Sequence, residues 1–448
     1  MDVLFGLIGR RQRAAAALSR PGTPSERRDL VLRYAYNGMS FLTLYPGWEY
    51  FHPAAGEGFV AFERHHGVAL AVGDPVCPQG EEPTLVEAFR AWALSEGLTP
   101  AFVGATERLA EAAATLGWKS LKVGEEPLFD LEDYAPRGNR TKKVRSAANQ
   151  ARKGGVLIET LPAGSAPPAT VELEMLNVQR AWQSSRNIEA LSFTLRLAPL
   201  DHIEDKIVLL ARKNGRLEGF VTCIPVAARN AYYIEDMIRR PDAPNGVSEL
   251  LFLGAVEECR AWGAAVANLG LAPLRNTRQQ PHGHRVVGTG LELTFRHLNL
   301  FYKFKPLEHF KAKFGPDRWE NAYLVYRPGR LTRVAIALLA AFTPGALGPL
   351  TAAVSRFRPR RASAKGESPT GFSGREVAGM VATLAAAAGY AAAGLQHPEL
   401  LDPLRFGVHT LTAPLVDAGD AARDHLVVDS LLLIGAGGWY IRSAHRGG

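Results

Sequence analysis

Short runs of alternating hydrophobic and polar residues recur between residues 29 and 330, and stretches with the spacing of amphipathic helices separate them. A period of two predicts strands with one buried face, so this region is predicted to be a mixed α/β (α+β) domain. In its first part, the predicted strands are 58–64, 68–72, 101–104 and 118–123, and the predicted helices are 84–96 and 106–116.

The second part of this region repeats the order of the first. Hairpin strands precede a helix and one further strand, which resembles two acetyltransferase-like (GNAT) folds in tandem, although other α/β domains also mix strands and helices this way. We expect a first half at residues 29–160 and a catalytic second half at residues 161–330. The predicted elements of the second half are helix 171–186, strands 207–213, 216–225 and 231–239, helix 248–262 and strand 266–269.

The ends of the chain have a different pattern. Residues 1–28 form a basic leader, and residues 331–375 combine an interrupted apolar segment, predicted to be interfacial, with a basic linker. Residues 376–448 contain two apolar runs, 377–395 and 426–441. A helix of 19 residues is about 28 Å long, which is close to the thickness of a bilayer core.

Charge flanking these runs predicts their orientation. Basic residues precede the first run and follow the second, whereas five acidic residues lie between them. The positive-inside rule then predicts a membrane hairpin with both ends cytoplasmic, so the catalytic domain is expected on the cytoplasmic side of the cell membrane. An Ala-rich pair of soluble helices is the alternative.

Composition adds a preference for anionic partners. The chain of 448 residues has 52 Lys and Arg against 44 Asp and Glu, a net charge of +8, which favours nucleic acid or a membrane surface. Its three cysteines, Cys77, Cys223 and Cys259, show no metal-binding spacing and are expected to be buried, reduced thiols. No metal and no cofactor are predicted.

Basic residues gather in two segments. In residues 301–326 lysines alternate with aromatic residues, a combination that can hold a polyanion while its rings pack; a surface helix with solvated lysines is the alternative. Residues 137–153 contain seven basic residues and no acid, and a helix there suits the phosphates of a nucleic acid, although a solvated helix or a membrane contact also fits. The candidate residues are Lys303, Lys305, Lys311, Lys313 and Trp319 in the first segment and Arg140, Lys142, Lys143, Arg145, Arg152 and Lys153 in the second.

Candidate chemistry lies at the end of the predicted strand YYIEDMIRR (232–240). Asp236 and Arg239 can converge where this strand ends or bulges, so that Arg239 binds a phosphate or an oxyanion and Asp236 orients a hydroxyl or an ammonium group. A structural ion pair between them is the alternative. The loop before the next predicted helix contains Pro241 and Pro244, which lack N–H donors, and Glu249 lies in the first turn of that helix; both features disfavour the pyrophosphate of acetyl-CoA.

The motif NLGLAPL (268–274) follows the next predicted strand. A strand that ends at Gly270 is expected to place Asn268 and free backbone N–H groups at the edge of a cleft, where they can stabilise an oxyanion. A tight turn without chemical function is the alternative.

Five ordered motifs together resemble the catalytic domain of the phosphatidylglycerol lysyltransferases, the multiple peptide resistance factor family. They are GDPV (73–76), KVGEEPLFDL (122–131), EDMIR (235–239), NLGLAPL (268–274) and the segment 301–326. The resemblance covers residues 30–330 and implies a tandem acetyltransferase-like fold that transfers an aminoacyl group from aminoacyl-tRNA to the glycerol hydroxyl of phosphatidylglycerol. It also implies that tRNA and lipid enter from opposite sides.

The resemblance assigns residues and leaves alternatives. Asp236 and Arg239 match the family's Asp-Leu-Met-Arg strand motif, with Met237 and Ile238 between them, and Glu249 resembles its acidic helix residue. The family's N-terminal multi-helix flippase has no counterpart before the matched region, so lipid flipping is not expected. Asp236, Arg239 and Lys311 are predicted to be catalytic, with aminoacyl-tRNA, an anionic phospholipid and the membrane as partners. A different acceptor (a peptidoglycan precursor, another lipid or an amine) and a non-catalytic membrane- or RNA-binding protein are the alternatives.

Overall fold

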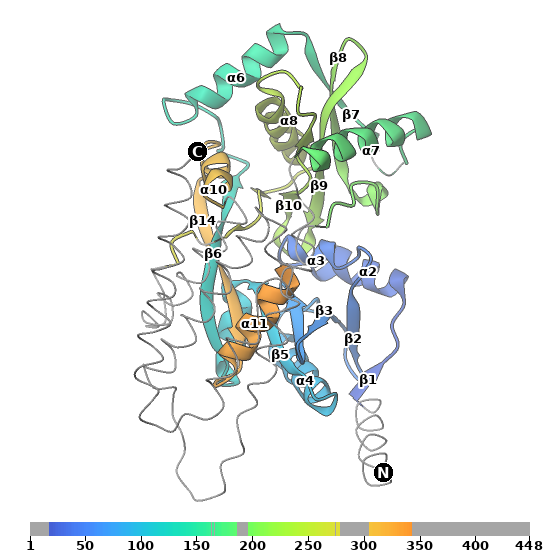
Figure 1. Cartoon of the computed structure of the whole chain (residues 1–448), viewed down its shortest axis with the longest axis vertical. Helices are drawn as coiled ribbons and strands as arrows, with labels where there is room; N and C mark the ends of the chain where they lie inside the picture. The colour runs from blue at the N-terminus through green and yellow to red at the C-terminus, as the bar shows by residue number, and fades with distance from the viewer. Residues whose placement is uncertain are drawn as a thin grey trace, which may run out of the picture. The chain divides into compact units, whose positions relative to one another are not determined.

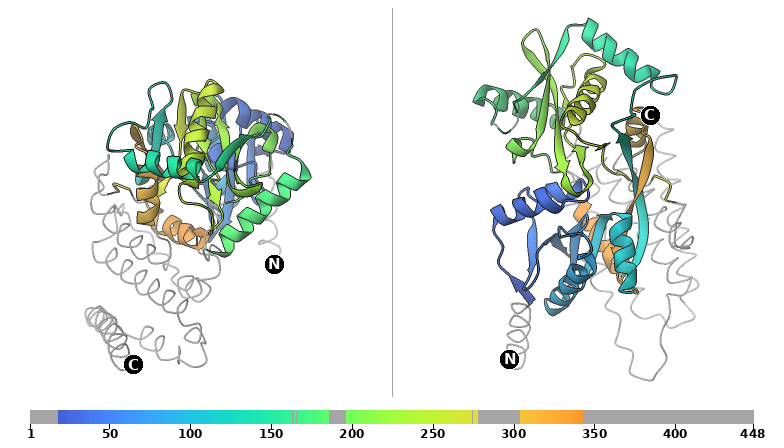
Figure 2. Two further views of the ribbon diagram at one scale, coloured as in Figure 1. Left: turned by 90° about the horizontal axis from the view of Figure 1, so that it is seen from above. Right: turned by 180° about the vertical axis from the view of Figure 1, so that it is seen from behind.

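The computed structural model describes residues 18–162, 164, 166–185, 196–273, 275–277 and 304–342, which belong to one compact unit. Within these residues, fourteen strands form one mixed sheet that helices cover (Figures 1 and 2). The strands are β1 (Ser19–Arg20), β2 (Glu49–Pro53), β3 (Val60–His65), β4 (Val68–Val72), β5 (Thr99–Ala105), β6 (Lys119–Asp130), β7 (Val156–Thr160), β8 (Ile207–Lys213), β9 (Arg216–Val226), β10 (Ala231–Ile234), β11 (Ile238–Arg239), β12 (Val266–Asn268), β13 (Ala272–Pro273) and β14 (Arg318–Tyr326).

The helices lie between these strands, and most of the longer ones were predicted from the hydrophobic pattern. They are α2 (Pro24–Tyr34), α3 (Met39–Leu42), α4 (Glu82–Ser95), α5 (Glu107–Thr115), α6 (Lys142–Lys153), α7 (Ala169–Ser184), α8 (Val247–Ala261), α10 (Phe304–Ala312) and α11 (Leu331–Phe342), with short 3-10 helices η2 (Ile203–Asp205) and η3 (Ala227–Arg229).

One arrangement of strands occurs twice. In the first half, β2, β3 and β4 are antiparallel, α4 follows, and β5 then pairs with β4 in parallel. In the second half, β8, β9 and β10 are antiparallel, α8 follows, and β12 pairs with β10 in parallel. The repeated order predicted from the sequence is therefore present, and in each half the last antiparallel strand and its parallel neighbour end side by side.

Two long strands join the halves. Strand β6 pairs with β14 along most of its length, and its final residues also pair with β12. Strand β14 in turn pairs with β5 of the first half, so a single sheet runs through both halves (Figure 1). Because β14 comes from residues after α10, the fold of the first half depends on the C-terminal part of the described chain.

Apolar residues at alternate positions fill both faces of this sheet. On β8, Ile207 and Leu209 pack under α6 and α8, whereas Val208 and Leu210 pack under α7. The same period of two makes β8 apolar over most of its length, as expected for a strand that is buried on both sides. A separate aromatic-rich core in the first half packs α4 and α5 against β2–β5.

The N-terminal residues of the predicted leader that the structure describes belong to the fold. Helix α2 begins at Pro24, where the Thr23 hydroxyl accepts a hydrogen bond from the Glu26 N–H (3.1 Å), a normal N-cap for a helix with proline in its first turn. Strand β1 pairs with β2. The predicted boundary at residue 28 thus falls inside a helix, while residues 1–17 lie outside the described residues.

The apolar residues just after 330 also pack within the fold. Helix α11 lies on β3 and β4, where it buries Val334, Ala337, Leu338 and Ala341. For residues 331–342, packing against the sheet therefore accounts for the apolar sequence that we had expected to be interfacial. In the part of the chain that the structure describes, no helix is long and apolar enough to cross a bilayer. The predicted hairpin in 377–441 lies outside that part.

Candidate active site

The central strand of the second half breaks where the candidate acids lie. Strand β9 pairs Cys223 with Ile234 and Phe220 with Ile238, so two residues of β9 lie opposite the three residues 235–237. This extra residue is a bulge, and it ends the alternation that would place neighbouring side chains on opposite faces. The predicted single strand 231–239 is therefore corrected to β10 and β11. The side chain of Glu235 is 5 % exposed, and Asp236 is 5 % exposed, so both carboxylates are buried.

The carboxylate of Glu235 is held from three directions. Its Oε2 atom accepts a hydrogen bond from the hydroxyl of Tyr45 (2.8 Å) and a longer one from the hydroxyl of Thr222 (3.4 Å). The amine of Lys206 lies 3.8 Å from the same oxygen and donates to the carbonyl of Ala198 (2.9 Å). The remaining oxygen, Oε1, has no hydrogen-bond partner.

Asp236 is less well satisfied than its neighbour. Its backbone N–H donates to the Thr222 hydroxyl (3.3 Å), but its Oδ2 atom is buried without a partner. Burial raises the pKa of Asp236 well above its usual range, and the adjacent Glu235 carboxylate adds to the rise. Burial likewise raises the pKa of Glu235 and lowers the pKa of Lys206. Buried polar atoms are nearly always paired, so two unpaired carboxylate oxygens at one place indicate a binding site.

The neighbouring strand end is organised by Asn268. Its amide donates to Glu126 Oε2 (2.6 Å), and its Oδ1 atom accepts the N–H of Gly270 (2.6 Å). The N–H of Leu269 donates to the carbonyl of Pro127 (3.3 Å). The expectation of free backbone N–H groups at this turn is therefore wrong for Leu269 and Gly270, because Asn268 and strand β6 occupy them.

Lys311 reaches this turn from α10. Its amine donates to the carbonyls of Gly270 (2.8 Å) and Leu271 (2.7 Å), and the side chain is buried. Burial lowers the pKa of Lys311 to about 7, although the nearby Glu126 carboxylate acts in the opposite direction. We had expected Lys311 to hold a phosphate. A buried amine that donates to two carbonyls is not placed to hold a solvent-exposed phosphate. It is placed to exchange a proton near neutral pH.

Tyr233 lies between the two groups of residues. It pairs with Asn268 in the parallel register of β10 and β12, and its buried phenol lies near the carboxylates of Glu235, Asp236 and Glu126, which together with burial raise its pKa. Gly270 has a φ of +72°, and a Cβ atom there would lie 2.5 Å from the Tyr233 hydroxyl. Glycine thus allows the turn to close on the ring.

The other predicted phosphate ligands are engaged differently. Arg239 is half-buried and donates to the carbonyl of Arg240 (3.1 Å), and the described residues include no ion pair between Arg239 and Asp236. Lys313 forms an ion pair with Glu249 in the first turn of α8 (2.7 Å). Trp319 lies under the guanidinium of Arg275, 3.9 Å from its ring centre. Lys303 lies outside the described residues, and Lys305 lies in α10 with its side chain outside them.

The basic segment forms α6 and the turn before it, as predicted. Val144, Ala148 and Ala151 are buried against α8, which turns the basic residues to solvent. A close approach of the two helices fixes this orientation, because a Cβ at Gly246, the N-cap of α8, would overlap the carbonyl of Ala147. Among the described residues, no acidic side chain pairs with the solvent-facing Arg140, Lys142, Lys143, Arg152 or Lys153.

Four residues of this site escaped the sequence analysis. Tyr45 and Lys206 carry no pattern that marks them, because each reaches the site from a distant segment. Glu235 and Glu126 stand inside two of the motifs, EDMIR and KVGEEPLFDL, and adjacent acidic residues in an apolar strand were the available signal. The remaining predicted roles, including those of Arg239 and Trp319, stay predictions.

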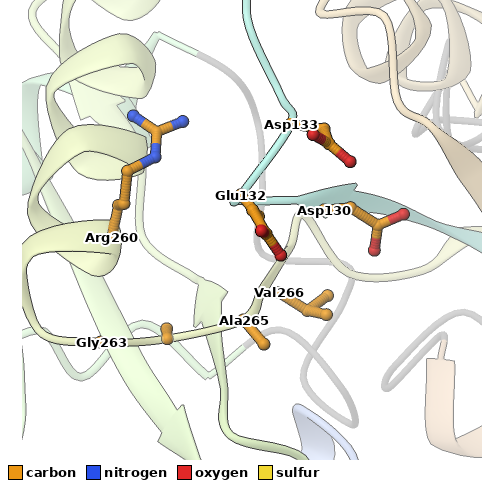
Figure 3. Close-up of a pocket in the computed structure, with 8 residues that line it drawn as sticks. Asp130, Glu132, Asp133, Arg260, Gly263, Ala265 and Val266 are labelled. Carbon is orange, nitrogen blue, oxygen red and sulfur yellow. The ribbon is translucent and has the colours of Figure 1, made fainter.

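A surface pocket of about 570 Å³ lies elsewhere, where β12 begins (Figure 3). Acidic residues at the end of β6, Asp130, Glu132 and Asp133, line it together with Arg260 of α8. The Arg260 guanidinium is already bound to the carbonyls of Leu131 (2.6 Å) and Tyr134 (2.9 Å). None of the predicted site residues lines this pocket, and its acidic wall does not suit an anionic substrate.

Comparisons with known proteins agree with this geometry. The family model described as "Phosphatidylglycerol lysyltransferase, C-terminal" matches residues 28–326. The chain is 29% identical over 289 residues to the lysylphosphatidylglycerol biosynthesis bifunctional protein LysX of Nocardia farcinica, covering 63% of this chain and 25% of the relative. It is 25% identical over 311 residues to a phosphatidylglycerol lysyltransferase of Staphylococcus haemolyticus, covering 68% of this chain and 36% of the relative.

Solved structures show the same fold. The C-terminal domain of a putative lysylphosphatidylglycerol synthetase from Agrobacterium fabrum matches 72% of this chain and 97% of its own, with a TM-score of 0.61 and 26% identity. L-PGS from Bacillus licheniformis matches 72% of this chain and 98% of its own, with a TM-score of 0.61 and 20% identity. The resemblance read from the five motifs is thereby confirmed. The chain spans about a quarter to a third of the length of the two curated relatives described above.

Proposed function

The chain belongs to the phosphatidylglycerol lysyltransferase family, through the C-terminal domain of that family, and on this basis we propose that it is an aminoacyltransferase. It moves an aminoacyl group from aminoacyl-tRNA to the hydroxyl of phosphatidylglycerol. The observation that carries this proposal is the pair of buried strand ends in the second half. There Asp236 has an unpartnered oxygen, and the amine of Lys311 lies at the neighbouring turn.

The proposal includes a tandem acetyltransferase-like fold that does not use acetyl-CoA as its donor. Support comes from the strand order that occurs in both halves and from the starts of α4 and α8. An acetyl-CoA enzyme needs free N–H groups and positive potential where the helix after the central strand begins. Here Glu82 and Glu249 occupy the two positions, and each has a basic partner, Arg108 and Lys313. An acid at a helix start repels a pyrophosphate.

Ester transfer needs positioning and proton movement more than activation, because the donor is already an ester. The acceptor hydroxyl attacks the ester carbonyl, the bond to the ribose oxygen breaks, and the proton moves from the acceptor to the ribose. A neutral Lys311 has two N–H bonds, which match its two carbonyl acceptors, and one lone pair that can take the hydroxyl proton. Arg239 is the candidate for the lipid phosphate or the developing oxyanion.

The tRNA is assigned to α6. Its solvent-facing basic residues form a stripe without described acidic partners, which suits successive phosphates of an acceptor stem rather than a base sequence. Gly246 and Ala147 bring α6 against the start of α8, the helix that follows the candidate acids in sequence. A stem bound along α6 would therefore lie against the second half of the fold.

The acceptor is assigned to the membrane. Phosphatidylglycerol resides in a bilayer, so the protein acts at the cytoplasmic face of the cell membrane, with the apolar runs of 377–441 as a proposed anchor. Lys303, which precedes α10 in sequence, and Lys305, the second residue of α10, remain candidate contacts for an anionic headgroup.

Expression of the full chain in a bacterial host that lacks modified phospholipids tests this function. Total lipid analysed by mass spectrometry should contain a new aminoacylated phosphatidylglycerol. Its mass, compared with that of unmodified phosphatidylglycerol, identifies the amino acid. Asp236→Asn should remove this lipid. Labelled amino acid should enter the lipid only when charged tRNA is supplied, and ribonuclease treatment should prevent this. An unchanged lipid profile with folded, membrane-bound protein would exclude phosphatidylglycerol as the acceptor.

A further inference from the structure

We propose that Glu235 and Asp236 together form a site for one primary ammonium group, that of the transferred aminoacyl moiety. This inference rests on the proposed aminoacyl transfer and adds the residues that recognise the amino acid. Neither Glu235 nor its partners Tyr45 and Lys206 carries a role from the sequence motifs alone. The argument starts from the charges and unpaired atoms around the bulge.

A count of charges leaves one cation missing. Two carboxylates are buried side by side, and Lys206 is the basic group in contact with them, 3.8 Å from Glu235 Oε2. The Lys206 amine also donates to the carbonyls of Ala198 (2.9 Å) and Pro199 (3.4 Å), which fixes it away from the remaining oxygens. Glu235 Oε1 and Asp236 Oδ2 are left without partners. Burial of such a charge without a partner is strongly unfavourable.

An ammonium group matches the two unpaired carboxylate oxygens better than other ligands. It carries the missing charge and has three N–H donors, whereas a lipid hydroxyl would leave one carboxylate uncompensated. A divalent metal ion would require several further oxygen ligands. In the described part of the chain, the one group of three residues with metal-ligand spacing is His202, Glu204 and Asp205, and Arg28 already pairs with both acids there.

Aromatic rings complete the site. The ring centre of Tyr45 lies 4.8 Å from the amine of Lys206, so one ammonium group already lies over an aromatic face beside the acids. Tyr233 also lies near the acids, and a Cβ at Gly38 or Gly270 would touch its ring. Both tyrosines are close enough to the acids for their pKa values to rise. A second ammonium group bound to the two acids would therefore lie, like Lys206, near both carboxylates and aromatic rings.

The site should exchange a proton for its ligand. Groups facing the acid pair are Tyr45, Lys206, Thr222 and Tyr233, with Asp201 and Glu204 further out beside Lys206. Because burial raises the pKa of both acids, a proton competes with the ammonium for the pair. Affinity should therefore rise with pH as long as the ligand itself stays protonated.

Calorimetric titration of the full chain tests this without any need for turnover. Three probes separate the sources of the ammonium: alaninamide carries only an α-ammonium, N-acetyl-lysinamide carries only the side-chain ammonium, and lysinamide carries both. Titrations in buffers of different ionisation enthalpy count the protons released. We expect one of the single-ammonium probes to bind with release of up to one proton. Asp236→Asn and Glu235→Gln should each weaken that probe at least about tenfold, since each removes one carboxylate charge.

Folding is controlled by the melting temperature of each variant. Each substitution removes one of two adjacent buried negative charges and leaves the other carboxylate beside Lys206. Both variants should therefore have a melting temperature no lower than that of the wild type. Tyr45→Phe, which removes a single hydrogen bond to Glu235, should weaken the probe several-fold. Matched controls are Asp74→Asn, a buried aspartate outside the site, and Glu320→Gln.

The outcomes separate this inference from the proposed function. Binding that is lost in Asp236→Asn and Glu235→Gln supports the site, and the probe that binds identifies the α-ammonium or the side chain. Wild-type protein that binds no probe, or binds it equally well in both variants, overturns the inference even if aminoacylated lipid is made. Variant-sensitive binding without any lipid product would overturn the proposed acceptor and leave the ammonium site in place.

Discussion

The two halves place a buried aspartate at the same position and treat it in opposite ways. In the first half, Asp74 lies two residues after β4, and in the second half, Asp236 lies two residues after β10. Asp74 accepts the backbone N–H (2.8 Å) and the hydroxyl (2.6 Å) of Thr106, the residue that follows β5. The residue that follows β12 is Leu269, which offers no hydroxyl and gives its N–H to Pro127. Asp236 is therefore left unsatisfied.

This difference shows how one arrangement of strands serves two purposes. The first-half carboxylate closes the gap between its parallel strands and helps to begin α5, so it stabilises the fold. The second-half carboxylate is kept open at a cost in stability, as is common at sites that bind a charged ligand. The first half then acts as a support: its segment 38–45 contacts Tyr233 and Glu235, and β14 completes the shared sheet.

Asparagine at the two positions should give the largest contrast. Asp236→Asn should lower the transfer rate roughly 1000-fold, the scale seen when a charged group that orients substrate is lost. Asp74→Asn should leave transfer within about threefold of wild type and lower the melting temperature by about 2 to 6 °C, because the Thr106 N–H or hydroxyl loses its acceptor. Lipid aminoacylation assays and calorimetric melting provide the measurements.

The comparison would break if the two variants behaved alike. Equal losses of activity would mean that both aspartates take part in transfer, and a fully active Asp236→Asn protein would remove the second-half site from the mechanism. Stability measured as a function of pH tests the role of Asp74 in the first half separately. Burial raises the pKa of Asp74 to about 6, so the folded state holds a proton that the unfolded state has lost between about pH 4 and 6, and wild-type stability should fall across that window.

Lys311 should produce the next largest effect, and it too has a counterpart. Lys122 is also a buried lysine, but it pairs with Glu125 (2.6 Å), whereas Lys311 binds two carbonyls. Because the pKa of Lys311 is lowered to about 7, kcat/KM should rise up to tenfold per pH unit below that value and level off above it. Lys311→Met should lower kcat/KM roughly 100-fold and flatten this profile.

Two controls distinguish a base from a structural amine. Lys311→Arg keeps hydrogen bonds to the turn but stays protonated, so it should be as inactive as Lys311→Met. Lys122→Met should destabilise the protein without changing the pH profile of the remaining activity. A Lys311→Arg protein with normal transfer and an unaltered profile would show that the lysine only holds the turn in place.

The sequence predicted the strands and helices of both halves, but not the hydrogen bonds that distinguish Asp74 from Asp236. Periodicity located β3, β4 and β8 and the helices α4, α6 and α8 because each has an apolar face of regular spacing. It joined β10 and β11 into one strand, since nothing in YYIEDMIRR shows where a bulge would fall. Asp236 was identified from its motif, but its lack of a partner depends on Leu269 standing where the first half has Thr106.

Residues that reach the site from afar could not be predicted for a related reason. Tyr45 and Lys206 contact Glu235 across about 190 and 29 positions of sequence, and a single sequence carries no signal for such pairs. The oxyanion role predicted for the turn at Gly270 was wrong for the same reason. The acceptors for the N–H groups of this turn, Asn268 and Pro127, are brought to it only by the folded sheet.

The basic surface should give a smaller effect, confined to the second half. The triple variant Lys142→Ala, Lys143→Ala and Lys153→Ala should weaken tRNA binding about 10- to 30-fold near physiological salt and reduce the salt dependence of binding by about 2 to 3 contacts. The measurement is a filter-binding or anisotropy titration of tRNA at several salt concentrations. Lys119→Ala with Arg330→Ala, two exposed basic residues elsewhere, should leave affinity and salt dependence unchanged.

Equal losses from both sets would assign the binding to overall charge and not to α6. Uncharged and charged tRNA should respond alike, because the contact is to phosphates of the stem. If the triple variant alters the KM for lipid vesicles but not for tRNA, α6 faces the membrane.

The smallest effect is expected where the two halves agree, at the acid that begins the helix after each central strand. Glu249 and Lys313 form a partly exposed pair (17% and 29% exposed side chains), so Glu249→Gln should change the free energy of unfolding by less than about 1 kcal/mol. A stability curve in denaturant measures this. Acetyl-CoA should not bind to the wild type or to this variant, because prolines 241 and 244 still remove N–H donors. Acetyl-CoA binding that appears in Glu249→Gln would mean that this acid, and not the prolines before the helix, keeps the second half from binding acetyl-CoA.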